Sequence, residues 1–310
     1  MTGVRAGNVR IATGPVAWGV DFADSPGNPP WESVLDDIEE SGVGALELGP
    51  VGYLPEDPEA LRGALTTRGL TSVGSFIFDD LHDPSKLADV LATAERACAT
   101  IASSGGSMFV IIDRPDHVRV ATAGRSGAAP RLDGPRWQAM IETIATVAEV
   151  GRRHGLRPVV HPHAGGYIEF IDEIERLVAD TDLDLCLDTG HLAYAGIDAG
   201  WAIRRFASRL GYVHFKDIRR ERIDRVRADA MTFWDAIADG VFCPIGEGVV
   251  DITDVLSALD EAGYRGFATI EQDRVPGSGT PLEDLRRSLA VIESANQRRQ
   301  ALTAEIRGTA

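Results

Sequence analysis

Four histidines and two acidic residues follow short apolar segments, and together they have the chemistry of a metal site. The segment 183–187 is apolar at alternate positions, like a buried strand, and it runs into Asp188, with His191 three residues later. Three further apolar segments end in the same way, and the residues that follow them are His161 with His163, His214, and Glu271. Mixed imidazole and carboxylate groups suit divalent ions such as Mn, Co, Zn or Mg.

We therefore predict a single set of metal ligands, made of His161, Asp188, His214 and Glu271. A lone histidine is more often a hydrogen-bonded structural residue, so the grouping carries this prediction. A bound ion of this kind would act as a Lewis acid, polarising a carbonyl or orienting a hydroxyl.

The elements that must position these residues alternate regularly between strand and helix, which predicts an α/β fold with a parallel sheet. The expected strands are 9–13, 44–48, 70–78, 108–112, 157–161, 183–187, 211–214 and 266–271. The expected helices begin near residue 30 and then cover 58–68, 86–103, 135–154, 168–180, 199–210, 252–263 and 282–299.

Eight such units favour a closed (β/α)8 TIM barrel, in which all strands end at the same face and the active site lies there. The alternative is an open doubly wound sheet, but no G-x-G-x-x-G turn follows the first strand. No repeat or linker divides the chain, so we expect residues 1–310 to form one domain.

Three segments outside this alternation have their own predictions. Residues 117–134 show no regular spacing of apolar residues and are expected to be an exposed loop. The basic cluster Arg219, Arg220, Arg222 and Arg225 is expected in a solvated loop or a subunit contact, with attraction of an anionic substrate as the alternative. Residues 246–248, Gly-Glu-Gly, are expected to form a turn at the mouth of the site; they contain no phosphate-cradling pattern, so no phosphorylated substrate is indicated.

The bulk properties exclude several partners. The formal net charge of -16 argues against general affinity for nucleic acid or anionic membranes. The sequence has no apolar run long enough for a membrane span and its first ten residues lack a signal-peptide core, so a cytoplasmic location is expected. Cys98, Cys186 and Cys243 are far apart and are expected to be structural thiols.

Several motifs together resemble the xylose-isomerase-like barrel superfamily of sugar phosphate isomerases and epimerases, and within it the inosose dehydratases of inositol catabolism. They are Pro15-Val-Ala-Trp18, Glu47-Leu-Gly, His161-Pro-His-Ala-Gly, Leu187-Asp-Thr-Gly-His191, Val213-His-Phe-Lys-Asp217, Gly246-Glu-Gly-Val-Val-Asp251 and Ile270-Glu271. The resemblance implies a divalent metal, usually Mn or Co with Mg or Zn as alternatives, held by four side chains. It also implies a small sugar or cyclitol as substrate and allows a homo-oligomer.

One position departs from the pattern of the epimerases that this sequence resembles. There the first ligand is a glutamate that also serves as one of two acid/base carboxylates, whereas here it is His161. The paired-carboxylate mechanism loses one partner, which favours an elimination. We therefore expect proton abstraction next to a ketone, an enolate stabilised by the metal, and loss of the β-hydroxyl as water.

The expected roles follow from residue chemistry. Glu271 combines ligation with proton transfer, and His163 and His191 are candidates to protonate the leaving hydroxyl. Lys216 would hold or polarise a substrate oxygen, Asp217 would orient His214 or Lys216, and Glu47 would point into the site from the end of the second strand.

Three other functions stay open at this point, and a fourth is disfavoured. An isomerase or epimerase of a free ketose conserves the mass of its substrate, whereas a dehydratase loses water. A lyase that acts on an oxidised glycoside needs the same enolate chemistry. A silent binding protein would bind metal without turnover. An endonuclease of the same superfamily is disfavoured by the negative charge and by too few ligands for a three-ion site.

Overall fold

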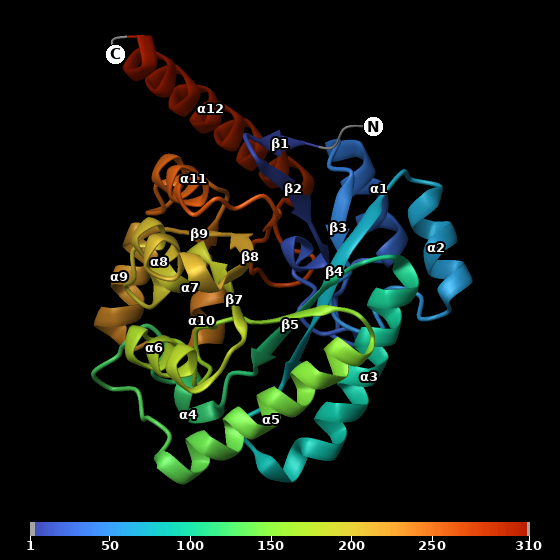
Figure 1. The fold of residues 1–310 in the computed structure, drawn as a ribbon, viewed down its shortest axis with the longest axis vertical. Coiled ribbons are helices and arrows are strands. Elements are labelled where there is room, and N and C mark those ends of the chain that lie inside the picture. The colour runs from blue at the N-terminus through green and yellow to red at the C-terminus, as the bar shows by residue number, and fades with distance from the viewer. Residues whose placement is uncertain (1–3, 309–310) are drawn as a thin grey trace.

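The computed structural model describes residues 4–308, and its centre is a closed barrel of eight parallel strands (Figure 1). The barrel strands are β2 (Val9–Thr13), β3 (Ala45–Glu47), β4 (Thr71–Asp79), β5 (Met108–Asp113), β6 (Arg157–Val160), β7 (Asp184–Asp188), β8 (Leu210–Phe215) and β11 (Phe267–Ile270). The ring closes where Thr13 of β2 pairs with Leu46 of β3. A short strand β1 (Arg5–Ala6) adds to β2 in the antiparallel direction. The predicted TIM barrel is therefore confirmed.

Helices follow the barrel strands and pack around them (Figure 1). They are α1 (Trp31–Ser41), α2 (Pro58–Thr66), α3 (Leu87–Ser104), α5 (Gly134–Arg153), α6 (Ile171–Asp180), α8 (Ala199–Arg205), α11 (Ile252–Glu261) and α12 (Pro281–Gly308). All eight expected helices are present, with ends within a few residues of the predicted ones except at α8 and α12. Helix α8 ends earlier because a 3-10 turn, η3 (Ala207–Arg209), precedes β8.

Alternation along each strand divides the apolar residues between two layers. In β5, Val110 and Ile112 face the barrel interior, while Phe109 and Ile111 pack against the surrounding helices. This is the expected consequence of side chains that point to opposite faces at successive positions of a strand. The interior is thus largely an apolar core that also contains the buried Tyr212–Thr269 hydrogen bond, and the ionisable side chains gather at the C-terminal end of the strands.

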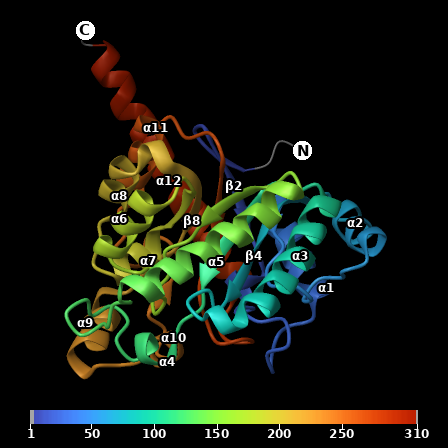
Figure 2. The same ribbon diagram turned by 60° about the horizontal axis from the view of Figure 1, so that its bottom comes forward.

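Additional elements form a small apolar cluster of their own on one side of the molecule (Figure 1, Figure 2). They are α4 (His117–Val120), α7 (Thr189–Tyr194), α9 (Arg220–Asp229), α10 (Phe233–Ala238) and the antiparallel pair β9 (Asp217–Ile218) and β10 (Phe242–Cys243). The exposed loop expected at residues 117–134 is wrong, because the segment includes helix α4 and buried side chains. The basic cluster begins at the N-cap of helix α9 and continues within it, so it does not lie in a loop, and the alternative of a subunit contact stays a prediction.

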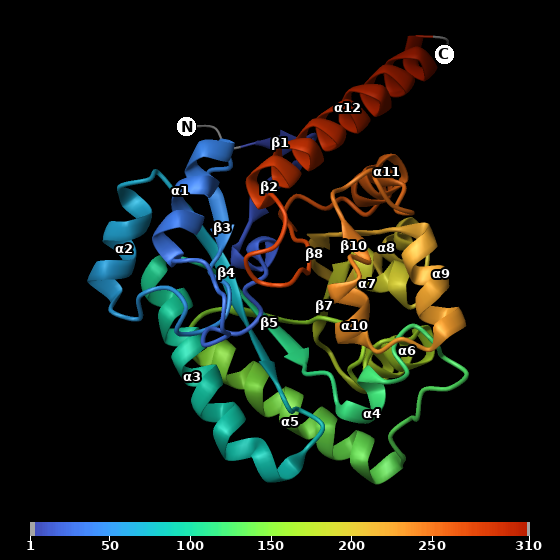
Figure 3. The same ribbon diagram turned by 180° about the vertical axis from the view of Figure 1, so that it is seen from behind.

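The long helix α12 begins against the barrel and projects beyond it towards the C-terminus (Figure 3). Leu285, Ile292 and Ala295 in its first part are buried against the main core. Within residues 4–308, no helix has both the length and the apolar character that a membrane crossing requires.

Candidate metal and catalytic site

The four predicted ligands converge at the C-terminal end of the barrel. His161 follows β6, Asp188 ends β7, His214 lies in β8 and Glu271 follows β11. These strands are consecutive neighbours in the sheet, so their ends lie side by side. All four side chains are buried.

Facing atoms of three of these residues, His161, Asp188 and His214, lie within 4.8 Å of one another, and Glu271 adjoins them through His214. Asp188 Oδ2 lies 3.6 Å from His161 Nε2 and 3.8 Å from His214 Nδ1, and His214 Nδ1 lies 3.2 Å from Glu271 Oε2. Asp188 Oδ2 and His214 Nδ1 are buried without a hydrogen-bond partner. Buried polar atoms are nearly always paired, so these two require a partner such as a cation. The residues therefore fit a divalent metal ion.

Each histidine of this set is held by the nitrogen that faces away from the others. His161 Nδ1 donates to the carbonyl of Pro162 at 2.7 Å, which leaves Nε2 with a lone pair towards Asp188. His214 Nε2 donates to the Glu47 carboxylate at 3.1 Å, and Nδ1, which would bind an ion once the ring is neutral, faces Asp188 and Glu271. Outer partners of this kind fix the tautomer and orientation of metal-binding imidazoles.

Asp188 is oriented by its position at the start of helix α7. Its Oδ1 accepts hydrogen bonds from the backbone N–H groups of Gly190 and His191, at 2.8 and 2.9 Å, as an N-cap does. Oδ2 is then left to point at the histidines. The sequence Asp-Thr-Gly-His therefore uses one carboxylate oxygen to begin a helix and presents the other to the site.

Glu47 has the geometry of a positioning residue. A register shift between Leu46 and Glu47 in the β3–β4 pairing lets its carboxylate reach His214. We expect Glu47→Gln to weaken Mn binding roughly 10- to 100-fold, because His214 loses its charged acceptor. Equilibrium dialysis measures this affinity, and Glu59→Gln, at an exposed position of α2, is the matched control. Unchanged affinity in Glu47→Gln would exclude this role.

A second group lies next to the first and contains His163, His191, Lys216 and Asp273. The Lys216 ammonium lies 2.6 Å from Asp273 Oδ1 and 3.2 Å from His191 Nε2. It also lies 3.2 Å from Glu271 Oε2, one of the first group. The imidazoles of His163 and His191 are 3.8 Å apart between ring centres. The structure thus places His191 beside the Lys216 ammonium and His163 against His191, while Glu47 lies on the other side at His214.

The environment sets the charge of this second group. Burial opposes a charged lysine, but Asp188, Asp273 and Glu271 raise the pKa of Lys216 well above its usual value. Burial and the neighbouring His161 lower the pKa of His163 well below its usual value, and burial with His163 does the same for His191. At neutral pH the group therefore combines one ammonium with two neutral imidazoles.

Two carboxylates in the site were not predicted from the sequence. Asp273 contacts Lys216, and its only sequence signal is its place two residues after Glu271. Asp21 lines the same pocket from the segment that precedes α1. Burial and the nearby Asp273 raise the pKa of Asp21 to about 8.

Asp217 has a different role from the predicted one. Its carboxylate accepts backbone hydrogen bonds from Gly246, Gly248 and Val250 at 2.9 to 3.0 Å, and it makes none to His214 or Lys216 among the described residues. A Cβ at Gly248 would lie 2.2 Å from that carboxylate, so only glycine fits. Asp217 thus fixes the 246–248 turn and the hairpin of β9 and β10.

The segment 117–134 supports the loop that carries His163. Arg119 is fully buried, and its guanidinium pairs with Glu173 at 2.6 Å and with Glu169 at 3.3 Å. Glu169 in turn accepts the backbone N–H of Gly165, next to the His163 loop, at 3.0 Å. The expected exposed loop is therefore anchored by a buried ion-pair cluster.

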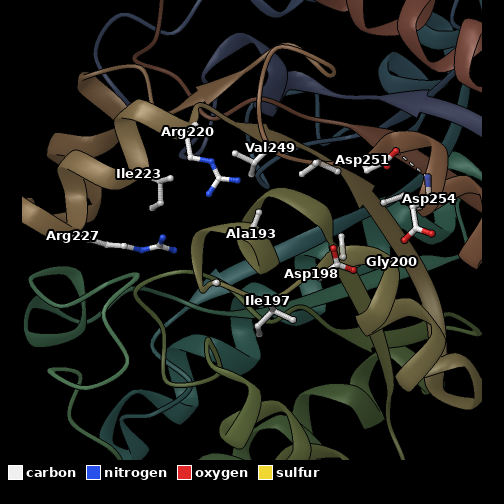
Figure 4. A pocket seen from close by; sticks show the side chains of 14 residues that line it. Ala193, Ile197, Asp198, Gly200, Arg220, Ile223, Arg227, Val249, Asp251 and Asp254 are labelled. Carbon is white, nitrogen blue, oxygen red and sulfur yellow. Dashed lines mark hydrogen bonds between the residues drawn. The ribbon is translucent and has the colours of Figure 1, made fainter.

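The pocket beside the proposed ligands is small and has one apolar wall. Val16, Phe76, Phe78 and Ile112 are its apolar lining residues, and the free volume is about 30 Å³. A wider cavity of about 260 Å³ lies outside the barrel between α7, α9 and α11 (Figure 4). Arg220, Arg227 and Asp198 line it, and none of the predicted site residues does.

Comparison with known proteins gives a consistent assignment of family. A family model described as "Xylose isomerase-like TIM barrel" matches residues 35–295. The inosose dehydratase of Geobacillus kaustophilus (strain HTA426) is 30% identical over 288 residues, covering 88% of this chain and 90% of that protein.

Two solved structures share the fold at low sequence identity. An L-ribulose 3-epimerase structure has a TM-score of 0.71 at 17% identity, covering 96% of this chain and 98% of its own. The IOLI protein, solved with a bound zinc atom, has a TM-score of 0.64 at 14% identity, with 96% of this chain and 97% of its own covered.

Proposed function

This chain belongs to the xylose isomerase-like TIM barrel family, and on that premise we propose that it is a divalent-metal-dependent dehydratase that removes water from a keto-inositol (inosose) or a related ketosugar. One observation carries the proposal: two buried ligand atoms that make no hydrogen bond, Asp188 Oδ2 and His214 Nδ1, face each other beside an ammonium and two neutral imidazoles. The relative named inosose dehydratase supports the reaction, and the zinc-bound neighbour supports a metal. Mn or Co is the expected ion.

His161 favours dehydration over epimerisation. Inverting a carbon centre requires one group to remove a proton and another to return it on the opposite face. With an imidazole in place of the first carboxylate and its Nε2 directed at Asp188, that residue is committed to ligation. An elimination needs only one base and one proton donor.

The remaining residues have roles that their contacts support. A bound divalent ion would supply Lewis-acid stabilisation of the developing enolate. Glu271 takes the proton from the carbon next to the ketone, and the C–H electron pair forms the new double bond. The bond to the β-hydroxyl then breaks, and that hydroxyl leaves as water with a proton from the Lys216 ammonium, because the neutral His163 and His191 have no acidic proton to give.

Two contacts refine the roles of the histidines and of Lys216. His191 Nδ1 accepts the backbone N–H of Ala164 at 3.2 Å, so the neutral ring carries its hydrogen on Nε2, on the side of Asp273. This places a hydrogen-bond donor where a departing oxygen can be held. Lys216 holds a substrate oxygen from the same side through its ammonium.

The test combines metal analysis with product mass. Purified protein loaded with Mn or Co is expected to contain about one ion per chain and to convert a keto-inositol into a product lighter by one water. A chelator-treated sample is the control and is expected to be inactive. A product of unchanged mass would instead support an isomerase, and release of an aglycone from an oxidised glycoside would support the related lyase. Full metal loading without turnover of any ketosugar would support a binding protein.

A further inference from the structure

Asp21 stands out among the ionisable residues that line the pocket, because its side chain has no partner. Within residues 4–308 it makes no hydrogen bond and no ion pair, and it is partly exposed. The other ionisable residues of the pocket each have at least one such contact: His161, His163, His214, Lys216, Glu271 and Asp273. Asp21 is therefore the carboxylate in this pocket that is free to bind something else.

The charges around Asp21 decide which chemical group of a ligand it can bind. Asp188, Glu271 and Asp273 surround the Lys216 ammonium, at 3.4, 3.2 and 2.6 Å. Lys216 and a divalent ion would together supply three positive charges, which these three carboxylates already balance, and Glu47 beside His214 adds a further carboxylate. Burial and Asp273 raise the pKa of Asp21 to about 8 in the metal-free site, and a bound divalent ion would lower that pKa and favour the charged carboxylate, which nothing else in the pocket balances. An anionic substrate group would meet repulsion there, whereas a hydroxyl can donate a hydrogen bond to the carboxylate.

Asp21 also belongs to a segment that closes the mouth of the site. The next residue, Phe22, stacks on Phe78 with ring centres 5.5 Å apart, and it lies 6.3 Å from Trp234 of α10. The free volume of about 30 Å³ is about that of one water molecule, far less than small-molecule sites require. A six-membered ring therefore needs more room than this structure provides, and opening of the Phe22–Phe78 contact beside Asp21 would supply it.

We propose that Asp21 is a substrate-binding residue that accepts a hydrogen bond from a ring hydroxyl not held by the metal ligands, and that it restricts the site to neutral polyhydroxy rings by repelling phosphorylated or carboxylated ones. The proposal rests on the proposed function for the substrate class. It adds that Asp21 selects neutral rings within that substrate class.

The test uses binding, so that it does not depend on turnover. Inositol is a neutral ring without a ketone and cannot be dehydrated by the proposed reaction. Isothermal titration of the Mn-loaded protein is expected to show binding of inositol and much weaker binding of inositol monophosphate. In Asp21→Asn, the affinity for inositol is expected to fall about tenfold, because a charged hydrogen-bond partner is lost. The ratio of the affinity for inositol to the affinity for inositol monophosphate is expected to decrease.

Asp24→Asn is the matched control, because Asp24 is exposed on the same segment and the substitution changes the charge equally. It is expected to bind both ligands like the wild type. The same behaviour in Asp21→Asn would overturn the proposal, as would equal binding of inositol and its phosphate by the wild type, or no binding of inositol. Normal inositol binding without dehydration of any keto-inositol would instead reject the proposed function while leaving the role of Asp21 intact.

Discussion

Asp188→Asn is expected to abolish both metal binding and turnover while the barrel stays folded. The amide oxygen can still accept the N–H groups of Gly190 and His191, so the start of α7 is preserved. The amide nitrogen, however, replaces Oδ2 with a neutral donor that faces His161 Nε2 and His214 Nδ1. We expect metal affinity to fall by more than the roughly 10- to 100-fold loss that changes in outer partners cause, since a ligand itself is removed.

Metal content per chain after dialysis measures this result, with circular dichroism as the check on folding. Asp184→Asn is the matched control, because Asp184 begins the same strand and its carboxylate pairs with Arg157 at the opposite end of the barrel. It is expected to retain metal. If Asp188→Asn held one ion per chain as tightly as the wild type, the proposed ligand set would be wrong.

The convergence of the site could be predicted because two simple rules combine. The period of apolar residues marks where a strand stops, as it does before Asp188, and a parallel barrel brings all strand ends to one face. The side chains that follow, such as His161 and Glu271, therefore had to be near one another. The rules do not give the register, so they did not show that Glu47 would contact His214 through a shift in β3.

The residues whose roles were not predicted from the sequence lie in segments without a regular spacing of apolar residues. Asp21 follows a 3-10 turn, η1 (Pro15–Trp18), and its position depends on the path of the loop. Arg119 lies in a stretch that looks polar and solvated, yet its partners are 50 and 54 residues further along the chain. Long-range ion pairing of this kind leaves no local pattern, because the partners meet only once the barrel has formed.

Arg119→Met is expected to cause the largest loss of stability. The substitution retains much of the apolar stem but leaves the carboxylates of Glu169 and Glu173 buried without their guanidinium partner. Breaking a buried ion pair from one side costs about 3–5 kcal/mol, and the loss should appear as a lower free energy of unfolding in urea. Arg136→Met, in an exposed pair with Asp133, is the matched control and is expected to change stability by less than about 1 kcal/mol.

The effect of Arg119→Met should also depend on pH, with a sign fixed by Glu169. Burial raises the pKa of Glu169 to about 7, against the opposing effects of the Gly124 hydrogen bond and the Arg119 charge. Because the folded pKa lies above the unfolded one, the folded state binds the extra proton, and stability falls as pH rises between about 4.5 and 7. Loss of Arg119 strengthens this preference for the protonated form. The penalty of Arg119→Met is therefore expected to be smaller at pH 5 than at pH 8, and a penalty that is equal at both would show that Glu169 is not the group left uncompensated.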